Sequence, residues 1–343
     1  MSKLSLAGEF WDAVTSGNHK RVKEMIDCGV DPDTRSPDQI RETPLNFTCM
    51  WNDVSTARVL LDGGANPRTP SSGPIGRTPF FAACANGYLG IVQALVESGV
   101  DPVKERRACE ALMIACENGH FEVLKYLAER GAVHAYPKSD FPLLCAAVRG
   151  GEGFEPVGLN VAISKFLLDF GPEVTPVNPP REICNVPPLH SACRYGDLAL
   201  AKLLLAYGAD IRSLDMGHRT PLMVACESGK PELAQLLIDA GSDLYIPHRG
   251  GKSILEHVLS KSGKNAGVAE AAMVLVEAMG LDPSVKIAGK SVLSRFAHAD
   301  AKEAIREAQR RLRAKLMGES IEEAMGAGAQ SPDEGKSSMS PSL

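Results

Sequence analysis

The chain has 343 residues, of which 44% are hydrophobic and 23% charged, so it can bury a large core and wholesale disorder is excluded. A formal net charge of -5 provides no overall positive field, and we therefore exclude nucleic acid as a partner. The N-terminus lacks the apolar stretch of a secretory signal, and no long apolar run predicts membrane insertion. We expect a cytoplasmic protein, or a nuclear one.

An internal repeat organises the sequence. A Leu or Phe opens one apolar segment, and nineteen residues later a Gly closes the next. Six units keep this spacing: Phe10 to Gly29, Leu45 to Gly64, Phe80 to Gly99, Leu112 to Gly131, Leu189 to Gly208 and Leu222 to Gly241. Units opening at Leu143 and Leu255 carry insertions, and a ninth unit opens at Leu293 without a closing Gly.

Each unit has room for two short helices and a tight turn. Pro precedes the opening residue in five units, where the first turn of a helix tolerates it. Side chains placed to cap the first helices are Thr43, Thr78, Thr220, Ser253 and Ser291. The residue four before the closing Gly predicts a buried stripe on the second helices: Met25, Leu60, Leu95, Leu127, Leu167, Leu204, Leu237 and Val276. The Gly itself supplies the left-handed residue that ends each second helix.

These openings carry a family resemblance. Thr78-Pro79-Phe80, Thr220-Pro221-Leu222 and Pro188-Leu189-His190-Ser191-Ala192 resemble the T-P-L-H-x-A motif of ankyrin repeats, and Gly208-Ala209-Asp210 is similar to their closing turn. Over residues 6–299 the resemblance implies an all-α ankyrin solenoid of about nine stacked helix-turn-helix units, with projecting hairpin loops and a concave face. Residues 300–326 are expected to form an amphipathic C-terminal helical cap, and residues 327–343 a disordered tail.

The sequence offers little support for a catalytic site. The Gly-rich insertion at 150–160 is the remote candidate for an enzyme site, but it offers only Glu152 and Glu155. Gly251-Lys252-Ser253 and Gly289-Lys290-Ser291 resemble the end of a phosphate-binding loop but lack its earlier Gly, so we interpret them as turns. We expect no enzymatic activity, no catalytic residue and no cofactor.

The nine cysteines predict neither a metal site nor disulfides. Five occupy one position, four residues after the opening residue: Cys49, Cys84, Cys116, Cys193 and Cys226. Val14 and Ala147 fill the same position in other units, so we interpret it as a slot for a small buried side chain. Cys184, in a loop, is the candidate for a reactive thiol.

Function is predicted from positions that the resemblance places beside the concave groove, five and six residues after each opening residue. The predicted protein-binding residues are Met50, Trp51, Asn86, Glu117, Asn118, Arg149, Arg194, Tyr195 and Glu227. Trp, Tyr and Arg most often dominate binding energy, which favours Trp51, Arg149, Arg194 and Tyr195. We predict a monomeric protein–protein interaction module that scaffolds or regulates one or more partner proteins.

An alternative assigns partner binding to the C-terminal part. The basic run Arg310-Arg311-Leu312-Arg313-Ala314-Lys315, and a tail in which Ser331 and Ser340 precede prolines, could engage the partner while the repeats act as a carrier.

Overall fold

The chain divides into two compact units, Met1–Met216 (unit 1) and Gly217–Leu343 (unit 2). The computed structural model describes residues 3–38, 41–71, 76–105, 107–136, 142–149, 159–180, 182–247, 251, 253–261, 266–280, 286–287 and 290–291. The expected ninth repeat from Leu293, the helical segment 300–326 and the tail 327–343 lie outside these residues.

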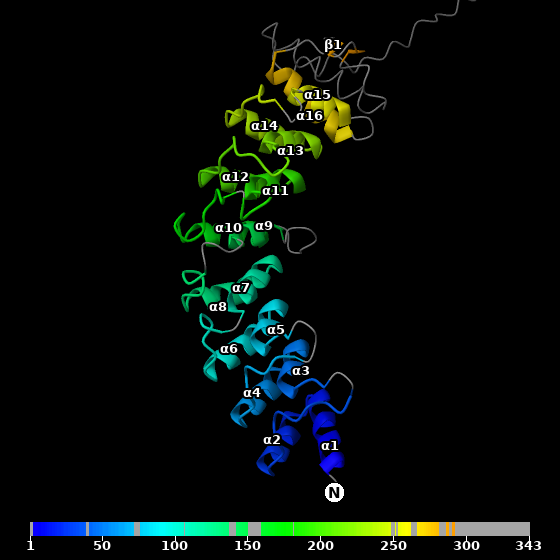
Figure 1. Cartoon of the computed structure of the whole chain (residues 1–343), viewed down its shortest axis with the longest axis vertical. Helices are drawn as coiled ribbons and strands as arrows, with labels where there is room; N and C mark the ends of the chain where they lie inside the picture. The colour runs from blue at the N-terminus through cyan, green and yellow to red at the C-terminus, as the bar shows by residue number, and fades with distance from the viewer. Residues whose placement is uncertain are drawn as a thin grey trace, which may run out of the picture. The chain divides into compact units, whose positions relative to one another are not determined.

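Unit 1 is built from pairs of short helices (Figure 1). The helices are α1 (Lys3–Thr15), α2 (His19–Asp27), α3 (Pro44–Trp51), α4 (Val54–Asp62), α5 (Pro79–Asn86), α6 (Leu89–Glu97), α7 (Ala108–Glu117), α8 (Phe121–Ala128), α9 (Leu143–Arg149), α10 (Leu159–Leu168), α11 (Pro188–Tyr195) and α12 (Leu198–Ala206). First helices pack on first helices, and second helices such as α2, α4 and α6 on one another. The prediction of an all-α repeat fold is confirmed.

Unit 2 continues the same scheme. Its helices are α13 (Pro221–Glu227), α14 (Pro231–Asp239), α15 (Ile254–Lys261) and α16 (Ala266–Ala278). A small antiparallel hairpin follows, in which β1 (Lys286–Ile287) pairs with β2 (Lys290–Ser291). Ser291, predicted to cap a helix, lies in β2, and the residues after it are outside the described part of the chain.

The first helices begin where the sequence predicts. Thr43, Thr78 and Thr220 each accept a hydrogen bond from the backbone N–H three residues later, and each is followed by Pro. Ser253 caps α15 in the same way, and the Glu256 carboxylate in turn accepts from the Ser253 N–H. Local sequence therefore sets these boundaries.

Helix α7 differs at its start. It begins at Ala108, although the repeat predicts an opening at Leu112. No Pro stands before Leu112, and Ala108, Glu110 and Ala111 are among residues that a helix accepts readily, so the first helix of this repeat extends by about one turn.

The insertion after α9 is shorter than predicted. Leu159 and Asn160, assigned to a loop at 150–160, belong to the first turn of α10, where the Asn160 side chain donates to the Asp197 carboxylate at 2.7 Å. The earlier part of the insertion, 150–158, lies outside the described residues. Asn160 is therefore a structural residue of α10.

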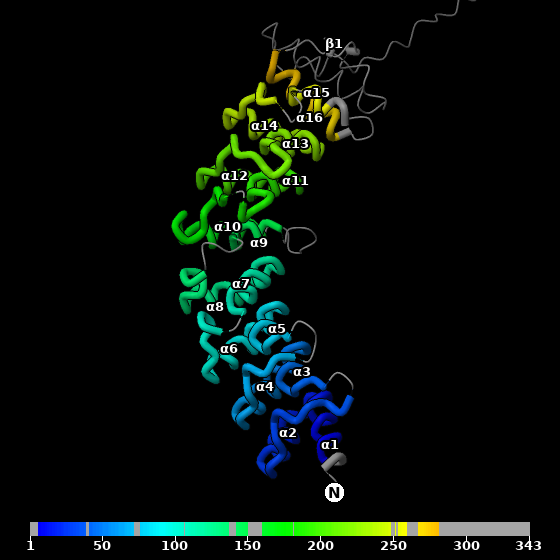
Figure 2. The backbone as a smooth tube through the Cα atoms, viewed as in Figure 1, coloured from blue at the N-terminus to red at the C-terminus, as the bar shows by residue number. Residues whose placement is uncertain are grey.

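The closing glycines and the buried stripe are both confirmed. The eight closing glycines all have positive φ, from 64° at Gly280 to 98° at Gly99. All eight members of the predicted stripe on the second helices are buried. The backbone tube in Figure 2 follows these turns from one helix pair to the next within each unit.

Loops of successive repeats in unit 1 are hydrogen-bonded to one another. The Asp33 carboxylate accepts from the Asn66 N–H at 3.1 Å. Further along, Asn178 accepts from the Asp210 N–H at 2.8 Å and donates to the Gly208 carbonyl at 2.9 Å. Side-chain hydrogen bonds thus join neighbouring loops, in addition to the backbone bond from the Met216 N–H to the Asn185 carbonyl at 3.3 Å.

Candidate protein-binding surface

The predicted partner-binding residues lie at the ends of the first helices. Trp51, Asn86, Glu117, Arg149 and Tyr195 are the last residues of α3, α5, α7, α9 and α11. These helices pack on one another in chain order within unit 1. We call this edge the helix-end row, and it comprises Met50, Trp51, Asn86, Glu117, Asn118, Arg149, Arg194 and Tyr195.

Trp51 contacts Phe47, which in turn contacts Trp11. The Trp51 and Phe47 ring centroids are 6.1 Å apart, and Phe47 meets Trp11 edge to face at 5.9 Å. Phe47 and Trp51 are four residues apart on α3 and so share one side of the helix. Trp11 is buried, and its Nε1 donates to the Thr34 carbonyl at 2.9 Å. The stack leads from the core to Trp51, whose surface is 70% exposed, beside Met50 at 46%.

Two asparagines of the row also have a structural contact. The Asn118 side-chain amide donates to the Ala85 carbonyl at 2.7 Å, and the Asn86 amide lies 3.5 Å from the Cys49 carbonyl. Both carbonyls belong to the last turn of a helix, where the helix itself provides no partner. His120 Nε2 lies 2.9 Å from the same Ala85 oxygen. These amides therefore join the ends of neighbouring first helices.

The remaining members of the row offer charged and aromatic groups. Arg149 and Arg194 are exposed, and Tyr195 and Glu117 are half-buried. Tyr195 precedes Gly196, whose φ of 86° ends α11. Together with Trp51, the row therefore presents the residue types that most often contribute binding energy in protein interfaces.

Glu227 differs from the other predicted residues. It ends α13 in unit 2, where its side chain is only 8% exposed. One carboxylate oxygen accepts from Arg219 Nη1 at 3.0 Å, and the other pairs with His257 Nε2 from α15. The structure thus gives Glu227 a role in joining α13 to α15. Sequence reasoning missed this role because His257 lies thirty residues further along the chain.

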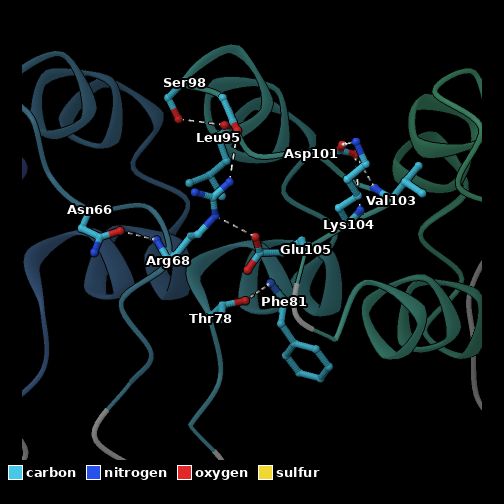
Figure 3. Close-up of polar contacts among 11 residues, drawn as sticks. Asn66, Arg68, Thr78, Phe81, Leu95, Ser98, Asp101, Val103, Lys104 and Glu105 are labelled. Atoms are coloured by element: carbon cyan, nitrogen blue, oxygen red, sulfur yellow. Dashed lines mark hydrogen bonds and ion pairs between the residues drawn. The ribbon is translucent and has the colours of Figure 1, made fainter.

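A second surface feature was not predicted. A cavity of about 260 Å³ is lined by Arg68, Pro70, Thr78, Lys104 and Glu105. The Glu105 carboxylate is almost fully covered and lies 3.3 Å from Arg68 Nε (Figure 3). Lys104 Nζ lies 3.4 Å from Asp101 Oδ2. The exposed Arg68 and Lys104 could pair with an acidic side chain of a partner, while Glu105 holds Arg68 in position.

The Asp101 carboxylate lies in the same loop as Lys104 and Glu105 and also fixes the backbone of that loop. It accepts from the Val103 N–H at 2.9 Å, and this bond together with Lys104 lowers the pKa of Asp101. Little in the sequence indicates this cavity. Arg68 and Glu105 follow successive closing glycines, but they do not belong to a pattern that repeats from unit to unit.

Arginine side chains also flank a phenylalanine in these repeats. The guanidinium carbons of Arg77 and Arg107 lie 5.5 and 4.9 Å from the ring centroid of Phe81. Arg107 also pairs with Glu110, which raises the pKa of Arg107. Cation–π contacts of this kind hold the long side chains in place and so lower the entropy that a partner would have to remove.

The five repeated cysteines are structural. All are buried, as predicted for a slot that takes a small side chain: Cys49, Cys84, Cys116, Cys193 and Cys226. Burial raises the pKa of Cys49 and of Cys193 to about 12, and it raises the pKa of Cys84 and Cys116 as well. Such thiols stay protonated at neutral pH and are poor nucleophiles.

The described residues contain no group of three or more His, Cys, Asp or Glu side chains arranged to bind a metal ion. In the same part of the chain, every helix is too short or too polar to cross a bilayer.

Most of the repeats match known protein families. Residues 10–106 and 157–248 match the family described as Ankyrin repeats (3 copies), and residues 108–134 match the family described as Ankyrin repeat. A search of curated proteins finds no significant match. Ankyrin repeats are generally protein–protein interaction modules.

Proposed function

Because the chain belongs to the ankyrin-repeat family, we propose that it binds a partner protein through the helix-end row of unit 1, with Trp51 as the principal contact. By holding that partner it would act as a scaffold or regulator, as a monomer in the cytoplasm or nucleus. The supporting observation is the exposure of Trp51 on top of the buried Trp11 and half-buried Phe47.

The free energy of binding depends on how much apolar surface Trp51 buries and on how much side-chain entropy it loses. A tryptophan that is 70% exposed has much apolar surface left to bury in a complex. Phe47 contacts the Trp51 ring on one side, which lowers the side-chain entropy that Trp51 would lose on binding. Met50 adds an adaptable apolar surface beside it.

The test compares two exposed aromatic residues. The full chain and its Trp51→Ala and Tyr245→Ala variants would be used to capture partners from a cell extract, and the captured protein would then be purified for titration. Tyr245 is 74% exposed in unit 2 and is the matched control. We expect Trp51→Ala to weaken binding at least tenfold, about 1.4 kcal/mol, and Trp51→Phe to recover part of the loss. Equal binding by all three proteins would contradict the proposal.

A truncation distinguishes the row from the tail of the C-terminal alternative, while the basic run 310–315 stays in place. A chain ending at Gly318 keeps most of the 300–326 segment and removes the tail with Ser331 and Ser340. We expect it to bind nearly as well as the full chain, because the tail would have to lose conformational entropy on binding. If the truncated chain fails to bind while Trp51→Ala binds normally, the tail is the binding element.

A further inference from the structure

The cavity beside Arg68 is built by two neighbouring repeats of unit 1. Arg68, Pro70 and Thr78 belong to the loop between α4 and α5, and Lys104 and Glu105 to the loop between α6 and α7. Its volume is about 260 Å³. One water molecule takes up about 30 Å³ of the liquid, so the cavity has room for a small polar group of a ligand.

Arg68 is positioned by its own loop and by the next one. Its backbone N–H donates to the Asn66 side-chain oxygen at 3.0 Å, and its Nε donates to the Glu105 carboxylate at 3.3 Å (Figure 3). Its Nη2 lies 3.5 Å from the Gly99 carbonyl oxygen. A guanidinium has five N–H donors in a fixed planar fork. Within the described part of the chain these contacts engage Nε and Nη2, so Nη1 stays available to a ligand.

The charges that a ligand meets at this cavity are positive. The side chains of Arg68 and Lys104 are 61% and 84% exposed, whereas that of Glu105 is only 3% exposed. Lys104 Nζ lies 3.4 Å from Asp101 Oδ2, which engages one of the three donors of the ammonium group. A ligand that enters the cavity therefore meets N–H donors from two different loops.

The local charge balance favours a ligand with a single negative charge. Arg68 and Lys104 are balanced by Glu105 and Asp101, so these four side chains sum to zero. A carboxylate adds one negative charge, and its two oxygens match the planar fork of a guanidinium. A phosphate group carries about −1.5 to −2, so the two nearby carboxylates repel it more strongly. The N-terminus of α5, at Thr78, adds a partial positive charge on the same side.

We propose that this cavity is a carboxylate-binding site, in which Arg68 and Lys104 hold an acidic side chain or the C-terminus of the partner protein. The inference rests on the proposed protein-binding function but not on the role of Trp51. Thr78 precedes α5 and Asn86 ends it, and a helix of eight residues is about 12 Å long. The cavity and the helix-end row thus lie at opposite ends of the first helices, and a partner that contacts both has to span that length.

The experiment titrates the full chain, with isotopically labelled arginine, at low ionic strength and follows the arginine Nε–Hε signals by NMR. The probes are N-acetylglutamate α-amide, with a side-chain carboxylate, N-acetylglutamine, with a terminal carboxylate, and the uncharged N-acetylglutamine α-amide. We expect a carboxylate probe to shift the signal that Arg68→Lys removes, and the uncharged probe to leave it in place. The carboxylate that binds more tightly identifies the source. Arg58, which pairs with Glu97 at 2.6 Å and does not line the cavity, is the control in the same spectrum.

Variants assign the binding to the cavity. Lys104→Gln changes a highly exposed side chain, so the chain should fold normally and bind the carboxylate about two- to fivefold more weakly. Arg58→Gln should leave this affinity unchanged. Trp51→Ala should leave it unchanged too, so failure of the cavity and failure of the helix-end row are distinguishable. An equal response of Arg68 to the uncharged probe, or an unchanged affinity in Lys104→Gln, would overturn the proposal. Tighter binding of inorganic phosphate than of either carboxylate would overturn it as well, because the site would then select the higher charge.

Discussion

The side-chain amide of Asn118 donates a hydrogen bond to the backbone carbonyl of Ala85, 2.7 Å away, and so joins the end of α7 to the end of α5. Removing this amide in Asn118→Ala should lower the free energy of unfolding by about 1 kcal/mol, the usual net value of one hydrogen bond. The loss stays moderate because His120 still reaches the Ala85 oxygen. Urea unfolding followed by circular dichroism measures it. Glu117→Ala, one residue earlier, is the control, and an equal loss there would show that the effect does not come from the Asn118 amide.

Replacing Leu204 tests whether the buried stripe on the second helices is part of the core. It is fully buried on α12, so Leu204→Ala should cost about 2–5 kcal/mol, the range found for a leucine removed from a core. Because repeats are stabilised chiefly by their neighbours, α10 and α12 should lose protection together in hydrogen exchange. Lys202→Ala, on the exposed side of the same helix, should change stability by less than about 0.5 kcal/mol. A similar small change for Leu204→Ala would mean that the stripe is not part of the core.

The covered carboxylate of Glu227 should stabilise the folded chain. Glu227→Gln keeps the shape but removes the charge that faces Arg219 and His257, so the variant should lose about 1–3 kcal/mol. The partial exposure of Arg219 argues for the lower half of that range. Thermal unfolding of Glu227→Gln and of Glu232→Gln, an exposed acid on α14, makes the comparison. Equal melting temperatures would show that the charge of Glu227 contributes nothing net to stability.

Alanine substitutions at Gly87 and Gly99 compare the cost of backbone strain with the added cost of a side-chain collision. Gly87 and Gly99 both have positive φ, so alanine at either position should cost about 1–2 kcal/mol. A Cβ at Gly87 would also collide with the His120 ring, whereas nothing lies within 4 Å of one at Gly99. We therefore expect Gly87→Ala to be the more destabilising of the two in urea unfolding. Adding His120→Ala should remove that extra loss, and a failure to do so would place the cause elsewhere.

Features governed by local sequence were predictable, because their causes lie within a few residues. Thr78 caps α5 through a bond to a backbone group three residues away, and Gly99 ends its helix by its own conformation. The buried position of Leu204 follows from helical periodicity. For such residues the sequence alone contains the physical reason.

Contacts between repeats could not be predicted in the same way. Asn118 and Glu227 lie six and five residues after the opening residue of their units. Their partners Ala85 and His257 are 33 and 30 residues away, and no sequence pattern identifies them as partners. The cavity beside Arg68 likewise depends on Glu105 from the next loop. The exposure of Trp51 agrees with its predicted position, while its role in binding stays a prediction.

The aromatic stack of Trp11, Phe47 and Trp51 also provides an optical probe. The chain has two tryptophans, and both lie in the first two helix pairs, on α1 and α3. Intrinsic fluorescence therefore reports the N-terminal end of unit 1, whereas far-ultraviolet circular dichroism averages over all helices. If the two signals change at different urea concentrations, their separation measures how far cooperative unfolding extends along the repeats, with no label attached.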